Sequence, residues 1–192
     1  ESSKDYIISS LIKGLKPNLF SVEGMRTVTK RRFVDHDLNK LFEVYFDNFE
    51  ALPINTERLI CAWLEENLAA FDIVLVPDFG NGLITDRMIE ILCDQSQFLA
   101  VNTQINSGNR GYHVVTRYPR ADFISLNEPE IRLAVHNRHD PLERLVEEVA
   151  TRMDANHVAV TRGVDGLLFY NRQNGSHTTV PALSSKVLDR VG

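Results

Sequence analysis

Asn127 and Glu130 are the residues whose types and spacing best suit chemistry with phosphate. They stand where an apolar run, residues 121–124, gives way to a helical pattern that begins at Pro129. In open α/β sheets, ligands collect at the carboxyl ends of strands, beside helix N-termini that favour anions. An amide can hold an oxygen or a water, and a carboxylate can hold the waters around Mg²⁺. We predict that both residues face a crevice, although the same pair could instead form a capping box.

Asp78 is a second candidate, because it ends the continuous apolar run of residues 72–77. At the carboxyl end of a buried strand, its carboxylate could contact a substrate hydroxyl. As a structural residue, it would instead cap the following loop. The six histidines show no spacing typical of metal ligands, so we predict that they lie at the surface or at sheet edges; they are His36, His113, His136, His139, His157 and His177.

Strand-like and helical patterns alternate along the chain, which predicts an α/β fold with a mostly parallel sheet and helices on both faces. A hairpin is expected over residues 27–46, and Asn55 or Thr56 is expected to start a helix whose inward face includes Leu59. The expected strands lie near residues 72–77, 98–102, 123–126, 157–161, 167–170 and 177–181, and the expected helices near 5–14, 56–68, 85–93, 129–135 and 142–153.

The composition is that of an ordinary globular protein with 192 residues, of which 43% are hydrophobic and 24% charged. The net charge of -5 argues against nucleic acid or an anionic membrane as a partner. No apolar run could cross a bilayer and the first residues lack a signal-peptide core, so the cytoplasm is the expected compartment. Cys61 and Cys93 lie in helical patterns and are expected to be buried thiols.

Three motifs in order resemble those of the ribokinase-like, or PfkB, carbohydrate kinases. They are Asn127-x-x-Glu130, Thr161-x-Gly163-x-x-Gly166 and the terminal Asp189-Arg190-Val191-Gly192. The hairpin region and Asp78-Phe79-Gly80-Asn81-Gly82 most resemble the heptose-7-phosphate kinase domain of bifunctional kinase/nucleotidyltransferase enzymes. The resemblance covers nearly the whole chain. It implies one truncated PfkB-type domain over residues 1–192, a three-layer α/β/α sandwich with a lid-type β-hairpin near residues 27–46.

The resemblance also implies ATP-dependent phosphorylation of a hydroxyl on a sugar or sugar phosphate. Mg²⁺ would be organised through water by Glu130 and Asn127, and an activating K⁺ would lie near Asp189 and Val191. Gly192 would begin the anion hole, with the catalytic Asp expected beyond it, so the 192 residues alone are expected to be inactive. A homodimer through the hairpin is also implied. The nucleotide would be bordered by Thr161, Gly163, Gly166 and Asn127, and the substrate by Asp78 and Asn81.

Several residues depart from the heptose kinase pattern. Asn81 stands where those enzymes usually have Lys, and residues 102–104 read Asn-Thr-Gln where Asp-Pro-Lys is common. These changes remove cations that would face a phosphate. They favour a second hypothesis, a catalytically silent ribokinase-like module kept for binding or dimerisation and fused to a nucleotidyltransferase. The Thr161 to Gly166 segment could likewise be a plain β-turn, and Asp189 a turn-stabilising residue.

Overall fold

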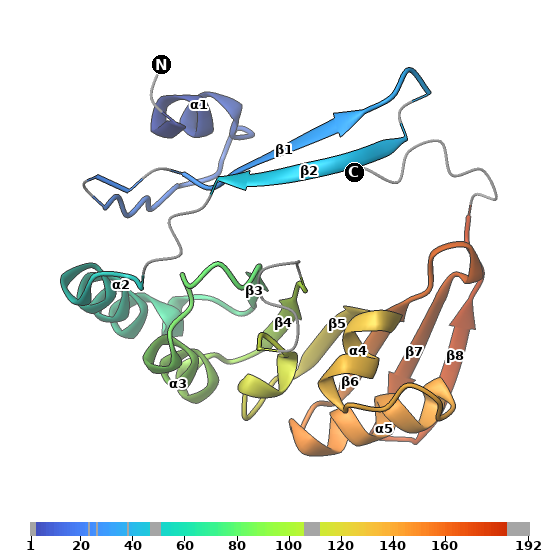
Figure 1. The fold of residues 1–192 in the computed structure, drawn as a ribbon. Helices are drawn as coiled ribbons and strands as arrows, with labels where there is room; N and C mark the ends of the chain where they lie inside the picture. The colour runs from blue at the N-terminus through green and yellow to red at the C-terminus, as the bar shows by residue number, and fades with distance from the viewer. Residues whose placement is uncertain are drawn as a thin grey trace.

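A six-stranded sheet forms the centre of the computed structural model, which describes residues 3–22, 24–25, 27–37, 39–46, 51–105 and 112–183. The strand order is β3-β4-β5-β6-β7-β8 (Figure 1). The first four strands are parallel to one another, β7 pairs antiparallel with β6, and β8 pairs antiparallel with β7. This confirms the predicted mostly parallel α/β sheet. The strands are β3 (Val74–Asp78), β4 (Leu99–Thr103), β5 (Phe123–Asn127), β6 (His157–Thr161), β7 (Leu167–Asn171) and β8 (Ser176–Val180).

Helices lie before and after β3 and after β5, and they cover one face of the sheet. Sequential parallel strands lie side by side here, and right-handed crossovers in one direction place the connecting helices on the same face. Within the described residues, the main body is therefore the sheet and this one helix layer, whereas the sequence predicted helices on both faces. The helices are α2 (Ile54–Asn67), α3 (Asp86–Gln95), α4 (Glu128–Ala134) and α5 (Leu142–Arg152), with short 3-10 turns η1 (Leu68–Ala70), η2 (Val115–Arg117) and η3 (Gly163–Asp165).

The hydrophobic core lies between the sheet and α3, α4 and α5. In β5 and β6, alternate residues such as Ile124 and Val158 are fully buried and point towards the helices. Leu145 and Val149 of α5 are equally buried, at the four-residue spacing of one helix face. Cys61 and Cys93 are buried free thiols, as predicted, and burial raises the pKa of both. None of the helices in the described ranges has the length and apolar character of a membrane span.

The predicted hairpin is present as β1 (Thr29–Val34) and β2 (Lys40–Phe46), an antiparallel pair separate from the main sheet. Figure 1 shows it beyond the sheet, beside the short helix α1 (Ser3–Ser10), which ends earlier than the predicted 5–14. Asp35 closes the hairpin by accepting hydrogen bonds from the backbone N–H groups of Asp37 and Asn39. Because the main sheet does not pair with the hairpin, these hydrogen bonds in the turn help to stabilise it.

Two details of α2 differ from the sequence expectation. Pro53 occupies the N-cap position with an extended backbone (φ -57°, ψ 136°), so neither Asn55 nor Thr56 caps the helix. Its fixed φ starts the helix without a side-chain cap. Leu59, expected to face inward, is 63% exposed, whereas Ile60 and Cys61 are buried. The periodicity of α2 admits either face, and its packing against α3 selects the one through Ile60 and Cys61.

Candidate functional site

The predicted nucleotide residues meet at the carboxyl ends of two neighbouring parallel strands. Asn127 ends β5 and Thr161 ends β6, and the two are direct partners in the register. The Thr161 hydroxyl donates to the carbonyl oxygen of Leu126 over 3.4 Å, a long hydrogen bond that leaves the hydroxyl close to the strand end. Both residues are exposed. The sheet therefore brings together two motifs that are 34 positions apart in the sequence.

Asn127 and Glu130 form the capping box that the sequence left as an alternative. The side chain of Asn127 accepts from the backbone N–H of Glu130, and Glu130 Oε2 accepts from the backbone N–H of Asn127, each over 2.9 Å. Glu130 Oε1 accepts a second backbone N–H, from Ile105, over 3.2 Å. Glu130 is only 6% exposed. It consequently ties the loop after β4 to the start of α4, and its carboxylate reaches any ligand only through its remaining lone pairs.

Glu128 joins the two predicted nucleotide motifs by ion pairs. Its Oε1 lies 2.8 Å from Arg132 within α4, and its Oε2 lies 3.3 Å from Arg162, which follows Thr161. The hydrogen bond from Arg132 has the largest effect on the pKa of Glu128 and lowers it. Burial opposes this, and the hydrogen bond from Arg162 adds to the lowering. The carboxylate is thus charged near neutrality and links the start of α4 to the turn after β6.

The segment from Thr161 to Gly166 forms the β6–β7 turn. Gly166 donates its N–H to the carbonyl of Gly163, and the N–H of Arg162 donates to the carbonyl of Gly166. Both glycines have positive φ, +60° at Gly163 and +82° at Gly166. A Cβ at Gly166 would lie 2.0 Å from the carbonyl oxygen of Val180, whereas a Cβ at Gly163 would meet nothing within 4 Å. The backbone needs glycine at Gly166, and Gly163 faces open space.

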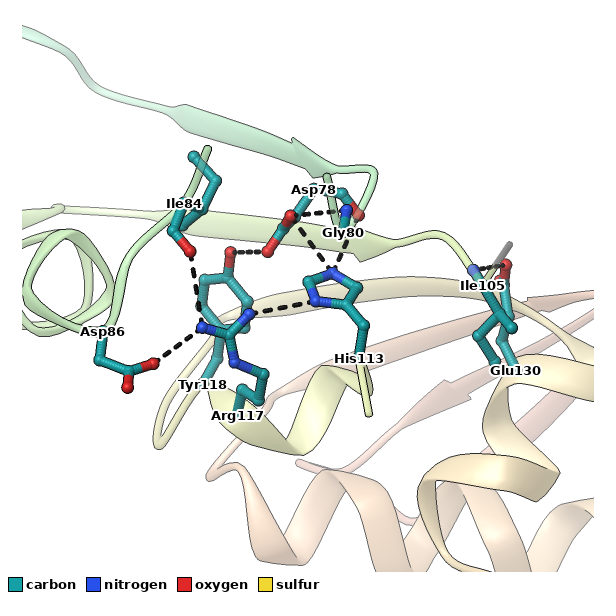
Figure 2. Close-up of polar contacts among 9 residues, drawn as sticks. All are labelled: Asp78, Gly80, Ile84, Asp86, Ile105, His113, Arg117, Tyr118 and Glu130. Carbon is teal, nitrogen blue, oxygen red and sulfur yellow. Dashed lines mark hydrogen bonds and ion pairs between the residues drawn. The ribbon is translucent and has the colours of Figure 1, made fainter. Parts of the chain in front are cut away.

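Asp78 lies at the end of β3 in a buried polar cluster (Figure 2). It is 4% exposed, and three groups donate to its carboxylate: the N–H of Gly80 over 3.1 Å, the hydroxyl of Tyr118 over 2.9 Å and Nε2 of His113 at 3.2 Å. Burial alone would raise the pKa of Asp78, but these hydrogen bonds outweigh burial and lower it. Both carboxylate oxygens of Asp78 therefore accept hydrogen bonds from groups of the protein itself.

Asn81 lies in the loop that follows Asp78 and is exposed. With Gly82 and Leu83 it lines a groove of about 660 Å³. Across the groove lie residues of α1 and of the segment that leads into β1, among them Lys4, Phe20 and Thr27. The structure therefore places Asn81 at an open surface and Asp78 behind it.

His113 contradicts the expectation that every histidine is at the surface or at an edge, because it is 5% exposed. Its Nδ1 lies 3.1 Å from a guanidinium nitrogen of Arg117, which can only donate. Nδ1 therefore accepts, and the proton is on Nε2, which faces Asp78. Burial and the Asp78 carboxylate raise the pKa of Tyr118, which keeps its hydroxyl a donor. In the sequence, the spacing His113-x-x-x-Arg117-Tyr118 is the one pattern that could have indicated this cluster.

Three predicted site residues, Asp189, Val191 and Gly192, lie outside the described residues. Within the described ranges, no group of three or more His, Cys, Asp or Glu side chains could hold a metal ion. Mg²⁺ in phosphate sites usually keeps several waters and takes one or two carboxylates besides the phosphates. The donors present, Glu130 and Asn127, fit a role through water in such a site.

Comparison with solved structures identifies the architecture. The chain matches the ribokinase of Giardia lamblia with a TM-score of 0.61 and 16% identity, over 86% of this chain and 52% of that one. It matches the ribokinase of Thermotoga maritima with a TM-score of 0.59 and 15% identity, over 84% and 50%. This is a ribokinase-like fold. The site residues above therefore lie on the carboxyl edge of a ribokinase-like sheet.

Sequence relatives of this ribokinase-like chain are bifunctional HldE proteins. The protein of Bradyrhizobium diazoefficiens is 26% identical over 170 residues, covering 86% of this chain and 34% of that protein. The protein of Nitrobacter hamburgensis is 27% identical over 183 residues, covering 93% and 36%. No family model matches. The chain spans about a third of these relatives, and the predicted resemblance to PfkB-type kinase domains of bifunctional proteins is confirmed.

Proposed function

We propose that the chain is part of an ATP-dependent carbohydrate kinase that phosphorylates a hydroxyl of a sugar or sugar phosphate. The observation that carries this proposal is the pairing of Asn127 with Thr161 at adjacent strand ends, in a ribokinase-like fold. The groove beside Asn81 lies at the end of β3 in the same sheet. A nucleotide at β5 and β6 and an acceptor beside β3 would then occupy neighbouring stretches of one sheet edge.

The chain's own residues would act mainly by positioning. Thr161, Gly163 and Gly166 would border the nucleotide, with open space above Gly163 for close approach of a ligand. Asn127 would hold a phosphate oxygen or a water. Asn81 would contact the acceptor, while Asp78 would act through the loop that it anchors. The anion hole would begin at Gly192, with the general base beyond it, as the resemblance implies.

Metal ions would complete such a site. Mg²⁺, when bound with ATP, would neutralise phosphate charge, and Glu130 with Asn127 would hold its waters. A monovalent cation such as K⁺ would be held near Asp189 and Val191. Among the structural neighbours, phosphofructokinase-2 of Escherichia coli was solved in complex with potassium. This neighbour shows that a protein of the same fold was crystallised with such an ion, and the place near Asp189 and Val191 is our proposal.

The second hypothesis, a binding or assembly module, rests on the same geometry. The Glu130 carboxylate already accepts two backbone N–H groups, from Asn127 and Ile105, in its capping and loop-tying roles. Asn81 provides no positive charge at the groove. A module of this kind, fused to a nucleotidyltransferase, would bind nucleotide or sugar without turnover. A phosphoryl-transfer assay with Mg·ATP and a panel of sugars and sugar phosphates separates the two hypotheses. It is made on the complete gene product and, in parallel, on residues 1–192. We expect residues 1–192 to be inactive alone.

Thr161→Val is expected to weaken Mg·ATP binding about tenfold, because it removes one hydroxyl at the proposed nucleotide edge and keeps the β-branched shape. Isothermal titration calorimetry on the chain gives the affinity. Thr178→Val is the matched control, since Thr178 is an exposed strand residue in β8, away from this edge. Equal affinities for Thr161→Val and the unchanged protein would contradict the nucleotide assignment.

Phe42→Lys is expected to convert a homodimer into a monomer. On one face of the hairpin, Phe33 and Phe42 stack at 4.4 Å, and Val44 and Phe46 continue the row at 37% and 52% exposure. A two-stranded hairpin with an open apolar face is marginal alone, so we propose that a second copy covers it. Sedimentation velocity measures the change. Tyr45→Lys, on the opposite face, should leave the dimer intact; a monomeric unchanged protein would refute the proposal.

A further inference from the structure

The loop of residues 79–85 connects β3 to α3 and carries one wall of the groove. Asn81, Gly82 and Leu83 are its groove-lining residues. Gly80 and Gly82 have positive φ, at +70° and +80°. Such backbone conformations are freely available to glycine and leave a loop with many alternatives in the absence of outside contacts. The shape of the groove therefore depends on the contacts that hold this loop, and those at its two ends are side-chain contacts from a distant segment.

His113 holds the first end. Its Nε2 lies 3.2 Å from the carboxylate of Asp78 and 3.3 Å from the carbonyl oxygen of the same residue. The carbonyl also accepts the N–H of Gln104 over 2.9 Å. Asp78 in turn accepts the N–H of Gly80, inside the loop. The imidazole thus fixes both the main chain and the side chain of the residue from which the loop departs.

Arg117 holds the second end. Its Nη2 donates to the carboxylate of Asp86 over 2.8 Å and lies 3.5 Å from the carbonyl oxygen of Ile84. Asp86 is the first residue of α3, and Ile84 lies just before it. The other guanidinium nitrogen, Nη1, lies 3.1 Å from Nδ1 of His113. One side chain therefore contacts the end of the loop and the histidine that holds its beginning, as Figure 2 shows.

We infer that His113 and Arg117 form a positioning clamp that sets the shape of the groove wall made by residues 79–85. Arg117 keeps His113 in the neutral tautomer with its proton on Nε2, and this proton makes the contact with Asp78. The clamp comes from the segment after β4, more than 25 residues along the chain from the loop that it holds. That the groove takes the acceptor sugar rests on the proposed function; the clamp itself rests on these contacts.

Residue-resolved amide hydrogen exchange tests the clamp on the chain without ATP or sugar, so its outcome is independent of the kinase proposal. The reporting amides are Gly80 and Gln104, which are bonded to Asp78, and Ile89, which is bonded to Thr85 at the start of α3. In His113→Leu we expect their exchange to accelerate about tenfold or more, while amides of β5 and β6 change less than about twofold. Uniform acceleration across the sheet would indicate general destabilisation and overturn the inference.

His113→Gln is the rescue variant, because a glutamine amide can donate where Nε2–H donates and carries no proton that titrates. We expect its exchange rates at Gly80 and Gln104 to stay within about threefold of the unchanged protein. His139→Leu is the matched control at an exposed histidine and should change nothing at these amides. Exchange in His113→Gln as fast as in His113→Leu would show that a neutral donor at this position does not hold the loop, and would overturn the inference.

Discussion

Gly166→Ala is expected to lower the free energy of unfolding by on the order of 3 kcal/mol, a large fraction of the stability of a domain. The glycine has φ +82° and ψ -131°, a conformation that residues with a Cβ rarely adopt. The new methyl group would also lie 2.0 Å from the carbonyl oxygen of Val180 and 2.8 Å from the nitrogen of Ala182. Both neighbours are backbone, so the end of β8 would have to move away from β7.

Gly163→Ala supplies the control for this prediction. Gly163 also has positive φ, at +60°, but its added Cβ would meet no atom within 4 Å. Only the conformational cost of roughly 1 kcal/mol should remain. Urea unfolding of both variants, followed by circular dichroism, gives the two values. Equal losses would mean that the contact with Val180 is relieved at little cost, contrary to the prediction.

Asp78→Ala is expected to cost about 3–5 kcal/mol, because it removes the common acceptor of a buried cluster. The Tyr118 hydroxyl would lose the acceptor it has at 2.9 Å, and the N–H of Gly80 would lose its bond to the carboxylate. Unsatisfied buried donors cost more than an exposed hydrogen bond gains. Asp94→Ala, at an exposed position on α3, is the control and should stay within about 0.5 kcal/mol of the unchanged protein.

The cost of Asp78→Ala should also depend on pH. The folded protein lowers the pKa of Asp78 below the ordinary value of 3.8, so the folded state binds fewer protons there than the unfolded state. The stabilisation is therefore complete above about pH 4 and is lost as the pH falls through the lowered folded pKa. Denaturant unfolding at pH 7 and pH 3 should show the gap between Asp78→Ala and the unchanged protein narrowing in acid.

The two proteins must be compared at each pH, because other carboxylates also lower the stability of the folded chain in acid. Hydrogen bonds from Arg132 lower the pKa of Glu128, and the whole chain will weaken in acid partly for that reason. The unchanged protein and Asp78→Ala share Glu128, so only the contribution of Asp78 remains in their difference. A gap that is constant, or that widens in acid, would show that the charge of Asp78 does not stabilise the cluster.

The sequence alone determined the α/β class, the strand positions and the residues at the strand ends. Residues 99–101 form a continuous apolar run, as expected of a parallel strand that is buried on both sides. Such patterns are local, and a strand placed by them fixes which residue ends it. The positions of Asn127 and Thr161 at a common sheet edge followed from this, because parallel strands end together.

Only the tertiary structure decided how the polar residues are used. Asp78 and His113 are 35 positions apart, and their contact depends on the register of β3 with β4 and on the path of the chain after β4. Local periodicity holds no information on that path, so His113 was expected at the surface. The outward turn of Leu59 has the same origin, since α2 presents more apolar residues than one face can bury and its packing against α3 selects among them. Helices and strands are determined by residues that are close in the sequence. The candidate site is formed by residues that are distant in the sequence and are brought together by the tertiary structure.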